Sequence, residues 1–540
     1  MLIKRYQTWI LAGISGILLI LSFPSFNLYP LAWISLIPLL IALQSTSTWK
    51  SAFLHGYLTG AIFFLGLIYW IALLYPFANI FLTTFACLLL AGYLAVYFGI
   101  FSVLLHGLPW KSGLPFIFTV STIWIGLEWV CSWFLTGFPW GSMGYTQWNN
   151  LPAIQIASIT GVHGVSFIVV LLNTTIADII HTHFISKNQS TTSKTSVAAT
   201  KGKAFVSSLL RFTHHASRFI PIVIVIACLI YGAQVLSKPI KTASDVKIAL
   251  VPGNVPQIEK WDRAYWSQIF ERYMNLVKAA DTEEPDLIIL PETALRGEIF
   301  VLEGNVYLPR LKQILEEQQI YLLTGLADYT AAPKIYNSVH LLSPTGEKLG
   351  SYSKMHLVPF GEYVPITRHL PNFIQLPTGF EAGKSIDLFP IPNSENRQMG
   401  AVICFESVFP DLFRKFVKKG ASVMGILTND AWFDGTAAPE QHLAMAPFRA
   451  VENRVAVFRC ANGGISCIID ALGRTTAPPI QANDTENFLV ARIPLSNHGG
   501  TVYTRYGDWF PILCFLVSGL IILYHHRTWI AAKLRRDDTT

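Results

Sequence analysis

Long apolar runs constrain this 540-residue chain more than any other feature of its sequence. A helix needs roughly 17–25 mostly apolar residues to cross a bilayer, and runs close to that length fill the first part of the chain and return near its end. Charged residues make up only 14% of the chain, against about 25% in typical soluble domains. We therefore expect a membrane protein with eight spans, near Thr8–Phe23, Leu28–Leu43, Ala52–Leu74, Ile80–Leu105, Leu114–Phe134, Val162–Ile180, Phe219–Val235 and Trp509–Tyr524. The first two are short, and a re-entrant or strongly packed pair is the alternative for them.

The positive charges in the short loops predict how these spans are oriented. Lys and Arg occur in alternate loops, at Lys50, at Lys111 and between residues 187 and 218, and again in the tail after Tyr524. The intervening loops, such as Thr136–Asn150, contain neither residue type. We expect both termini in the cytoplasm and the large polar segment after the seventh span on the outer side of the membrane.

The polar segment predicts a second, α/β unit. Most Asp and Glu lie between about Asp245 and Asn497, where short apolar runs alternate with amphipathic stretches, as in layered α/β domains. We expect a membrane domain over residues 1–240, an α/β domain over 241–498, and a last membrane helix with a cytoplasmic tail over 499–540. The expected strands are Val246–Val251, Asp286–Leu290, Tyr336–Leu342, Lys348–Ser353, Met399–Cys404, Val423–Thr428, Val455–Ala461 and Ile465–Ile469, and the expected helices lie near Ala264–Ala280, Pro410–Lys418 and Glu440–Glu452.

Cysteine spacing and charge argue against several classes of protein. The seven cysteines include no Cys-x-x-Cys pair and no regular spacing, so neither a zinc site nor a disulfide framework is indicated. The net charge of +7 has its excess in segments that flank the membrane, whereas nucleic-acid binding proteins gather it in one basic stripe. We expect no nucleic-acid partner, no metal and no organic cofactor.

One short stretch, Gly400–Ser407, suggests a nucleophile. Its apolar run ends at Cys404, and a buried strand there would carry the thiol to its carboxyl end, where open α/β sheets place reacting groups. A thiol with a pKa near 8.5 is mostly protonated at neutral pH, so attack requires a base that takes its proton. A free cysteine is by itself weak evidence, since such residues usually behave as small buried hydrophobes.

Two other stretches supply the groups that a nucleophilic thiol needs. Glu292 follows an apolar strand and is placed to act as the base. Lys354, with the amide that follows Cys404, would stabilise the oxyanion of a tetrahedral intermediate, and Glu362 would hold Lys354 in place. Each has an ordinary explanation, a turn for Pro291-Glu292 and an exposed ion pair for Lys354 and Glu362, so only their joint occurrence favours catalysis.

These motifs carry a family resemblance. Leu290–Thr293, Tyr352–Tyr363 and Met399–Glu406 resemble the Glu-Lys-Cys triad stretches of the nitrilase superfamily. Their longer context, including Gly253–Trp261 and Thr428–His442, resembles the apolipoprotein N-acyltransferase family of bacterial inner membranes, the membrane-embedded branch of that superfamily. The resemblance covers essentially the whole chain, including the number and orientation of the spans.

The resemblance implies a multi-span α-helical membrane domain joined to a nitrilase-like α-β-β-α sandwich in the periplasm. It assigns Glu292 as the base, Lys354 as the oxyanion stabiliser and Cys404 as the nucleophile. Positions that match supporting roles are Trp261, Glu362, Phe405, Glu406 and Phe433. The chain departs from the family pattern at two positions: Phe405 stands where the family often has Tyr, and Asp434 follows Phe433 where Gly is common.

The implied function is the transfer of an acyl chain from a phospholipid, with phosphatidylethanolamine as the expected donor. The acyl group would first form a thioester with Cys404 and then be transferred to the amino terminus of diacylglyceryl-cysteine apolipoproteins. This transfer completes lipoprotein maturation. The residues themselves leave two alternatives open: a membrane-tethered amidase or hydrolase of nitrilase type, and a transporter or binding protein with an external sensor domain. The spans carry little charge beyond Glu128 and Asp178, which disfavours a transporter.

Overall fold

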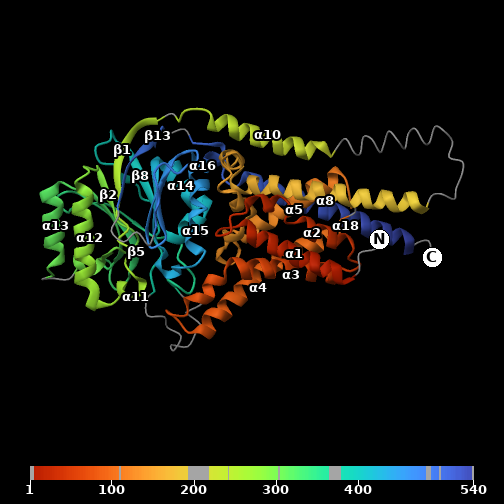
Figure 1. The fold of residues 1–540 in the computed structure, drawn as a ribbon, viewed down its shortest axis with the longest axis horizontal. Coiled ribbons are helices and arrows are strands. Elements are labelled where there is room, and N and C mark those ends of the chain that lie inside the picture. The colour runs from red at the N-terminus through yellow and green to blue at the C-terminus, as the bar shows by residue number, and fades with distance from the viewer. Residues whose placement is uncertain are drawn as a thin grey trace. The chain divides into compact units, whose positions relative to one another are not determined.

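The chain folds into two compact units, Met1–Ser237 together with Asp508–Thr540, and Lys238–Gly507. The computed structural model describes residues 5–108, 111–192, 218–240, 242–301, 305–363, 379–481, 488–497 and 500–537. Most of the basic segment between residues 187 and 218 lies outside the described residues. The first unit is helical and the second contains two β-sheets with covering helices (Figure 1).

The first unit consists of apolar helices. Among the described residues, four helices are long and apolar enough to cross a membrane: α4 (Ile80–His106), α5 (Leu114–Cys131), the Val162–His183 part of α8 (Val162–Thr192), and α10 (Phe219–Leu236). Shorter apolar helical segments are Tyr6–Ser22, Tyr29–Gln44, Leu151–Thr160 and Trp509–His525. Helix α3 (Trp49–Leu67) leads into a 3-10 helix, η2 (Tyr69–Leu74). The count of eight spans stays a prediction.

The carboxylates of Glu128 and Asp178 bind groups of neighbouring helices. Glu128 on α5 accepts hydrogen bonds from the Ser166 hydroxyl on α8, at 2.6 Å, and from the indole of Trp124, at 3.0 Å. Asp178 on α8 lies 2.6 Å from Nε of Arg218. Buried charges in an apolar unit are costly unless they are paired or hydrogen-bonded, so these contacts favour a structural role for both acids.

The second unit contains two sheets whose central strands are parallel. In the first sheet the order is β13-β1-β2-β4-β5-β6, with β3 beside β4, and in the second it is β12-β11-β10-β9-β8-β7. The strands are β1 (Thr242–Leu250), β2 (Leu287–Ile289), β3 (Leu295–Arg296), β4 (Leu322–Asp328), β5 (Tyr336–Leu342), β6 (Lys348–Ser353), β7 (Phe389–Pro390), β8 (Gln398–Ile403), β9 (Ala421–Asn429), β10 (Ala456–Asn462), β11 (Ile465–Ile469), β12 (Ile480–Gln481) and β13 (Leu489–Ser496). Strands β1, β2 and β4 run parallel, as do β8, β9 and β10, so each sheet gathers its carboxyl ends at one edge.

The alternation of side chains in β1 shows how the layers form. Val246, Ile248 and Leu250 belong to the core between the sheets, while Ala249 and Val251 belong to the core beneath helices α12 (Trp266–Asp281) and α13 (Tyr307–Gln318). Successive side chains of a strand point to opposite faces, so a buried strand must be apolar on both. Helices α14 (Pro410–Lys419) and α16 (Ala446–Asn453) contact the second sheet, and Figure 1 shows the helices outside the paired sheets. The predicted α-β-β-α sandwich is confirmed.

One predicted helix is wrong in its extent. The segment Glu440–Glu452 forms two helices, α15 (Ala438–Leu443) and α16, with a break between them. Pro447 lies in the first turn of α16, where its missing N–H costs nothing, whereas inside a continuous helix it would remove a hydrogen bond and clash with the preceding turn. The break therefore follows from the proline.

Candidate active site

The nucleophile candidate stands on a sharp turn directly after a strand. Strand β8 ends at Ile403, and Cys404 opens the 3-10 helix η11 (Cys404–Val408) with φ at +51°. Few residues other than glycine adopt this left-handed conformation, which costs roughly 1–2 kcal/mol. Two hydrogen bonds to the Cys404 carbonyl hold the turn, from the Ser407 hydroxyl at 2.9 Å and from Nε2 of His442 at 3.2 Å.

The base candidate is held from both sheets. Glu292 follows β2 and is 6% exposed. Its Oε1 accepts a hydrogen bond from Nδ2 of Asn337 on β5 at 2.7 Å, and its Oε2 accepts one from the main-chain N–H of Asn429 at the end of β9, at 2.8 Å. Because Asn337 belongs to the first sheet and Asn429 to the second, the carboxylate is fixed where the two sheets meet.

Lys354 lies between two carboxylates just beyond β6. Its Nζ is 2.8 Å from Oε1 of Glu362 and 3.6 Å from Oε1 of Glu292, and its side chain is 1% exposed. Burial lowers the pKa of Lys354, but Glu362 and then Glu292 raise it, so that the pKa lies well above its usual range. The ion pair of Lys354 with Glu362 is therefore buried, and the ammonium stays charged. This rules out the ordinary explanation of an exposed ion pair.

The thiol of Cys404 lies within electrostatic reach of both groups. Burial raises the pKa of Cys404, the carboxylate of Glu292 raises it further, and the ammonium of Lys354 lowers it, leaving the pKa well above its usual range. The resting group is a neutral thiol, so attack on a carbonyl requires simultaneous loss of the proton to a base. Glu292, Lys354 and Cys404, which are far apart in sequence, are thus brought together at the carboxyl ends of the strands.

Glu406 joins the strand that carries the thiol to the strand that carries the ammonium. Its side chain is fully buried. Oε1 accepts hydrogen bonds from the Tyr352 hydroxyl at 2.7 Å and from the main-chain N–H groups of Met355 at 2.7 Å and His356 at 3.1 Å. Oε2 accepts one from the main-chain N–H of Ile403 at 2.8 Å. Glu406 therefore fixes the residues on either side of Lys354 against the residue that precedes Cys404.

The three aromatic candidates lie in different surroundings. The ring of Phe405 packs against those of His356 and Phe409, with centroids 5.9 and 5.1 Å away. Phe433 ends the 3-10 helix η12 (Asp430–Phe433). Trp261 is 37% exposed and follows the short helix α11 (Gln257–Lys260), with the Arg296 guanidinium 5.2 Å from its ring centroid. Their roles in substrate binding stay predictions.

Comparison with known proteins identifies the family. Residues 15–175 match the apolipoprotein N-acyltransferase N-terminal domain, and residues 247–502 match the carbon-nitrogen hydrolase domain. A protein named apolipoprotein N-acyltransferase from Geobacter metallireducens is 34% identical, over 96% of this chain and 94% of its own length. The chain belongs to the apolipoprotein N-acyltransferase family. It is an N-acyltransferase with a nitrilase-like domain.

Further relatives share this full-length similarity. Apolipoprotein N-acyltransferase 2 of Treponema denticola is 30% identical over 87% of each chain, and the Haemophilus influenzae apolipoprotein N-acyltransferase is 30% identical over 97% of this chain and 95% of its own. Among solved structures, Nit3 of Saccharomyces cerevisiae, a member of branch 10 of the nitrilase superfamily, is similar over 48% of this chain and 92% of its own, with a TM-score of 0.36 and 20% identity.

A buried network of His442, Asp430 and Arg459 lies behind the nucleophile, and the sequence did not predict a role for it. His442, whose Nε2 contacts the Cys404 carbonyl, has its Nδ1 3.1 Å from Oδ1 of Asp430. Asp430 also pairs with Arg459. Burial raises the pKa of Asp430, but Arg459 and His442 lower it below its usual range. The only sequence signal was that Asp430 and His442 fall within the stretch that resembles the family.

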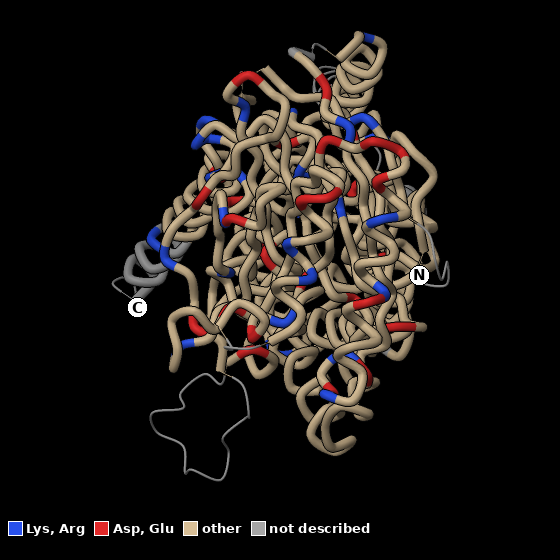
Figure 2. Tube along the Cα trace, turned by 90° about the vertical axis from the view of Figure 1, so that its left-hand side faces the viewer, with Lys and Arg blue, Asp and Glu red and all other residues tan. Residues whose placement is uncertain are grey.

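The positions of the charged and metal-ligating residue types bear on metal and nucleic-acid binding. Within the described parts of the chain, no three His, Cys, Asp or Glu residues are grouped so that they could hold a metal ion. Figure 2 shows Lys and Arg interspersed with Asp and Glu over the face that it presents, without one continuous basic stripe.

Proposed function

We propose that the chain transfers an acyl chain from a phospholipid to the α-amine of the diacylglyceryl-cysteine at the amino terminus of apolipoproteins. Family membership supports N-acyl transfer in lipoprotein maturation. The single observation that supports the mechanism is the grouping of the buried side chains of Glu292 and Lys354 with the partly buried Cys404. Phosphatidylethanolamine is the proposed donor.

In the first half-reaction, the carboxylate of Glu292 takes the proton of the Cys404 thiol as the sulfur attacks the ester carbonyl of the phospholipid. The carbonyl oxygen becomes an oxyanion, which the ammonium of Lys354 stabilises because it is already charged and desolvated. Collapse of this intermediate breaks the ester C–O bond and forms a thioester. The leaving alkoxide takes the proton from Glu292 and departs as lysophospholipid.

In the second half-reaction, the α-amine of the apolipoprotein attacks the thioester carbonyl, and Glu292 accepts a proton from the nitrogen. Lys354 again faces the oxyanion. Collapse breaks the C–S bond, forms the amide and returns the proton from Glu292 to the sulfur of Cys404. The buried ion pair of Lys354 with Glu362 keeps the ammonium in one position through both steps.

The membrane arrangement completes the proposal. We place the enzyme in the bacterial inner membrane with residues 1–240 spanning it about seven times, residues 241–498 in the periplasm, and residues 499–540 as a last span and cytoplasmic tail. The alternate positions of Lys and Arg in the short loops support this orientation. A domain at the outer surface would meet both a phospholipid and a membrane-anchored lipoprotein.

Intact-protein mass spectrometry after exposure to phospholipid vesicles tests the mechanism. Wild type should gain the mass of one acyl chain and lose it on treatment with hydroxylamine, which cleaves thioesters. Cys404→Ser should form no such adduct, while Cys467→Ser, a change at a buried cysteine of the same unit, should leave its formation intact. Full acyl-transfer activity of Cys404→Ser would contradict the mechanism.

The hydrolase alternative is disfavoured by the full-length relatives, which bear the acyltransferase name. The two functions differ in the group that resolves the thioester. Incubation of the purified protein with phospholipid, with and without a diacylglyceryl peptide, separates them. Acylated peptide is the expected product, whereas lysolipid and free fatty acid without acylated peptide would establish a hydrolase.

A further inference from the structure

Lys260 is a buried lysine that neither the sequence motifs nor the mechanism above uses. It ends the short helix α11, and the residue is 5% exposed. Its Nζ donates a hydrogen bond to the main-chain carbonyl of Glu292 at 2.9 Å. Lysine is almost never fully buried without a partner, and here the partner belongs to the residue that we propose as the base.

The turn that Lys260 contacts is tightly constrained. Thr293, directly after Glu292, has φ at +47°, in the left-handed region. On the other side, Gly325 of β4 allows a close approach: a Cβ at this position would come within 2.5–2.7 Å of main-chain atoms of Pro291, Glu292 and Thr293. The backbone of the base is therefore held between a glycine of the sheet and the ammonium of Lys260.

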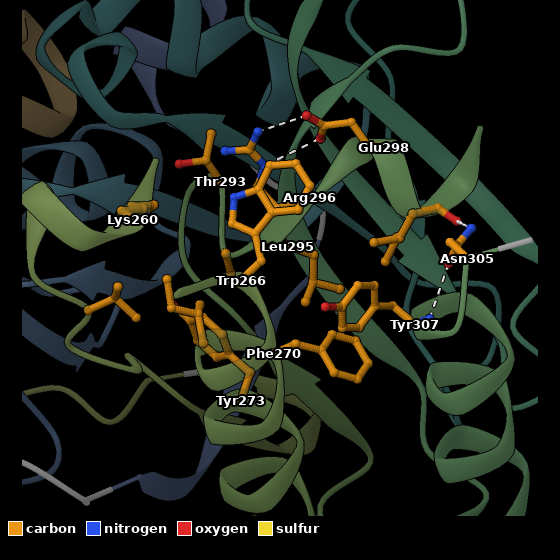
Figure 3. Close-up of a pocket in the computed structure, with 14 residues that line it drawn as sticks. Lys260, Trp266, Phe270, Tyr273, Thr293, Leu295, Arg296, Glu298, Asn305 and Tyr307 are labelled. Carbon is orange, nitrogen blue, oxygen red and sulfur yellow. Dashed lines mark hydrogen bonds and ion pairs between the residues drawn. The ribbon is translucent and has the colours of Figure 1, made fainter. Parts of the chain in front are cut away.

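Lys260 also faces the charges of the site. Burial lowers the pKa of Lys260 to about 7, although Glu292 and Cys404 both act to raise it. It lines a cavity of about 70 Å³ with the titratable residues Tyr273, Arg296, Glu298 and Tyr307 (Figure 3). Arg296 and Glu298 form an ion pair of 2.7 Å and largely neutralise each other. The net charge added by Lys260 therefore acts mainly on Glu292 and Cys404.

We propose that Lys260 is a positioning residue for the general base, which it serves by holding the main chain of Glu292 and placing a positive charge beside the Glu292–Cys404 pair. This inference rests on the proposed function in that it takes Glu292 as the base. Lys260 does not contact the reacting atoms. A cation at this place favours the forms in which the carboxylate and the sulfur are negatively charged. It therefore keeps Glu292 ionised and able to accept a proton, and it favours the free thiolate that alkylation detects.

Alkylation of Cys404 by iodoacetamide tests this independently of any lipid, because the thiolate is the reacting form. Peptide mass spectrometry separates Cys404 from Cys460 and Cys467. In Lys260→Met, which keeps the side-chain length and removes the charge, we expect alkylation at pH 6, where Lys260 with its pKa of about 7 is mostly protonated, to slow about tenfold, as loss of a nearby unit charge implies. The part of the pH profile below pH 7 should move to higher pH. The rate of Cys404 alkylation in Lys260→Arg should stay within about threefold of the wild-type rate.

Acyl-enzyme formation from phospholipid is the second measurement. Lys260→Met should slow acyl-enzyme formation about 10- to 100-fold, the range expected for loss of a hydrogen bond to a charged group. The acidic limb of the pH–rate profile for this step should also move to higher pH. Lys348→Met, at an exposed position of the same unit, should match wild type in both assays. Lys260→Gln, uncharged but still a donor, replaces the methionine variant if the latter does not fold, and should show the same slow alkylation.

Two outcomes would overturn the proposal. One is alkylation in the uncharged variant within twofold of wild type with an unchanged pH profile. The other is that Lys260→Arg slows alkylation and acyl-enzyme formation as much as Lys260→Met does at every pH, with no shift in the pH profile of either reaction. That result would indicate that Lys260 acts by packing alone. If wild type forms no acyl-enzyme while the alkylation shift of Lys260→Met is observed, the proposed function fails and the positioning role stands.

Discussion

Replacing Glu406 by glutamine should loosen the connection between the two strand ends of the site. The carboxylate accepts hydrogen bonds on both oxygens, three on Oε1 and one on Oε2. The amide of glutamine has one oxygen, so only one end accepts. With the oxygen toward Tyr352, Met355 and His356, the amide nitrogen faces the N–H of Ile403, and two donors oppose each other.

The cost follows from these contacts. An unsatisfied buried N–H costs about 1–3 kcal/mol, and three hydrogen bonds lose the strength that a charged acceptor gives them. Removing a buried charge offsets part of this, because burial raises the pKa of Glu406 above its usual range. We expect a net loss of about 2–4 kcal/mol in the free energy of unfolding, which corresponds to a fall of about 5–10 °C in Tm.

Thermal unfolding in detergent and the rate of acyl-enzyme formation measure the two consequences. Glu406→Gln should lower both the Tm and the rate of acyl-enzyme formation, since the main chain beside Cys404 and the main chain beside Lys354 lose their common hydrogen-bond acceptor. Glu347→Gln, at an exposed acid of the same unit, is the matched control and should change neither. If Glu406→Gln kept the wild-type Tm within about 1 °C and the wild-type rate, the anchoring role argued from the four hydrogen bonds would be refuted.

Two other perturbations test the charges of the site. Lys354→Met should slow acyl-enzyme formation about 10²- to 10³-fold, because it removes an oxyanion donor and leaves Glu292 and Glu362 as adjacent buried acids; a loss below tenfold by mass spectrometry would contradict this role. Burial, and then Lys354, hold the pKa of His356 at about 4, against about 6.5 in an unfolded chain. The unfolded state therefore binds the proton first, and the free energy of unfolding should fall by up to about 3 kcal/mol between pH 6.5 and 4. His356→Phe, which keeps the ring against Phe409, should lose this component of the pH dependence in chemical denaturation, and identical curves for both proteins would contradict it.

Local patterns predicted some strands closely and missed others for identifiable reasons. The hairpin strands β5 and β6 have the bounds expected for them, because the turn between them contains Gly346 with φ at +73°. Strand β4 was not predicted: all seven of its residues are buried, but Thr324 and Gly325 interrupt its apolar run. Strand β13 was also missed, because its partner β1 lies more than 200 residues away in sequence and no local pattern encodes that pairing.

The site shows the same division. Glu292, Lys354 and Cys404 could be proposed because each belongs to a specific stretch of sequence, although their catalytic roles stay predictions. Cys404 was expected inside its strand, yet it follows the strand in a left-handed turn. Asn337 and Lys260, which hold Glu292, gave no signal, since one polar side chain bound to a distant residue leaves no periodic pattern in the sequence.

The raised pKa of the Cys404 thiol also has a consequence for the life of the enzyme outside the cytoplasm, where we propose that this unit lies. Oxidants attack thiolates far faster than neutral thiols, and Cys404 at rest is neutral because burial and Glu292 raise its pKa. Burial likewise raises the pKa of Cys460 and, to about 11, that of Cys467. The resting enzyme should thus resist sulfenic acid formation and mixed disulfides, exposing reactive sulfur only during the proton transfer to Glu292.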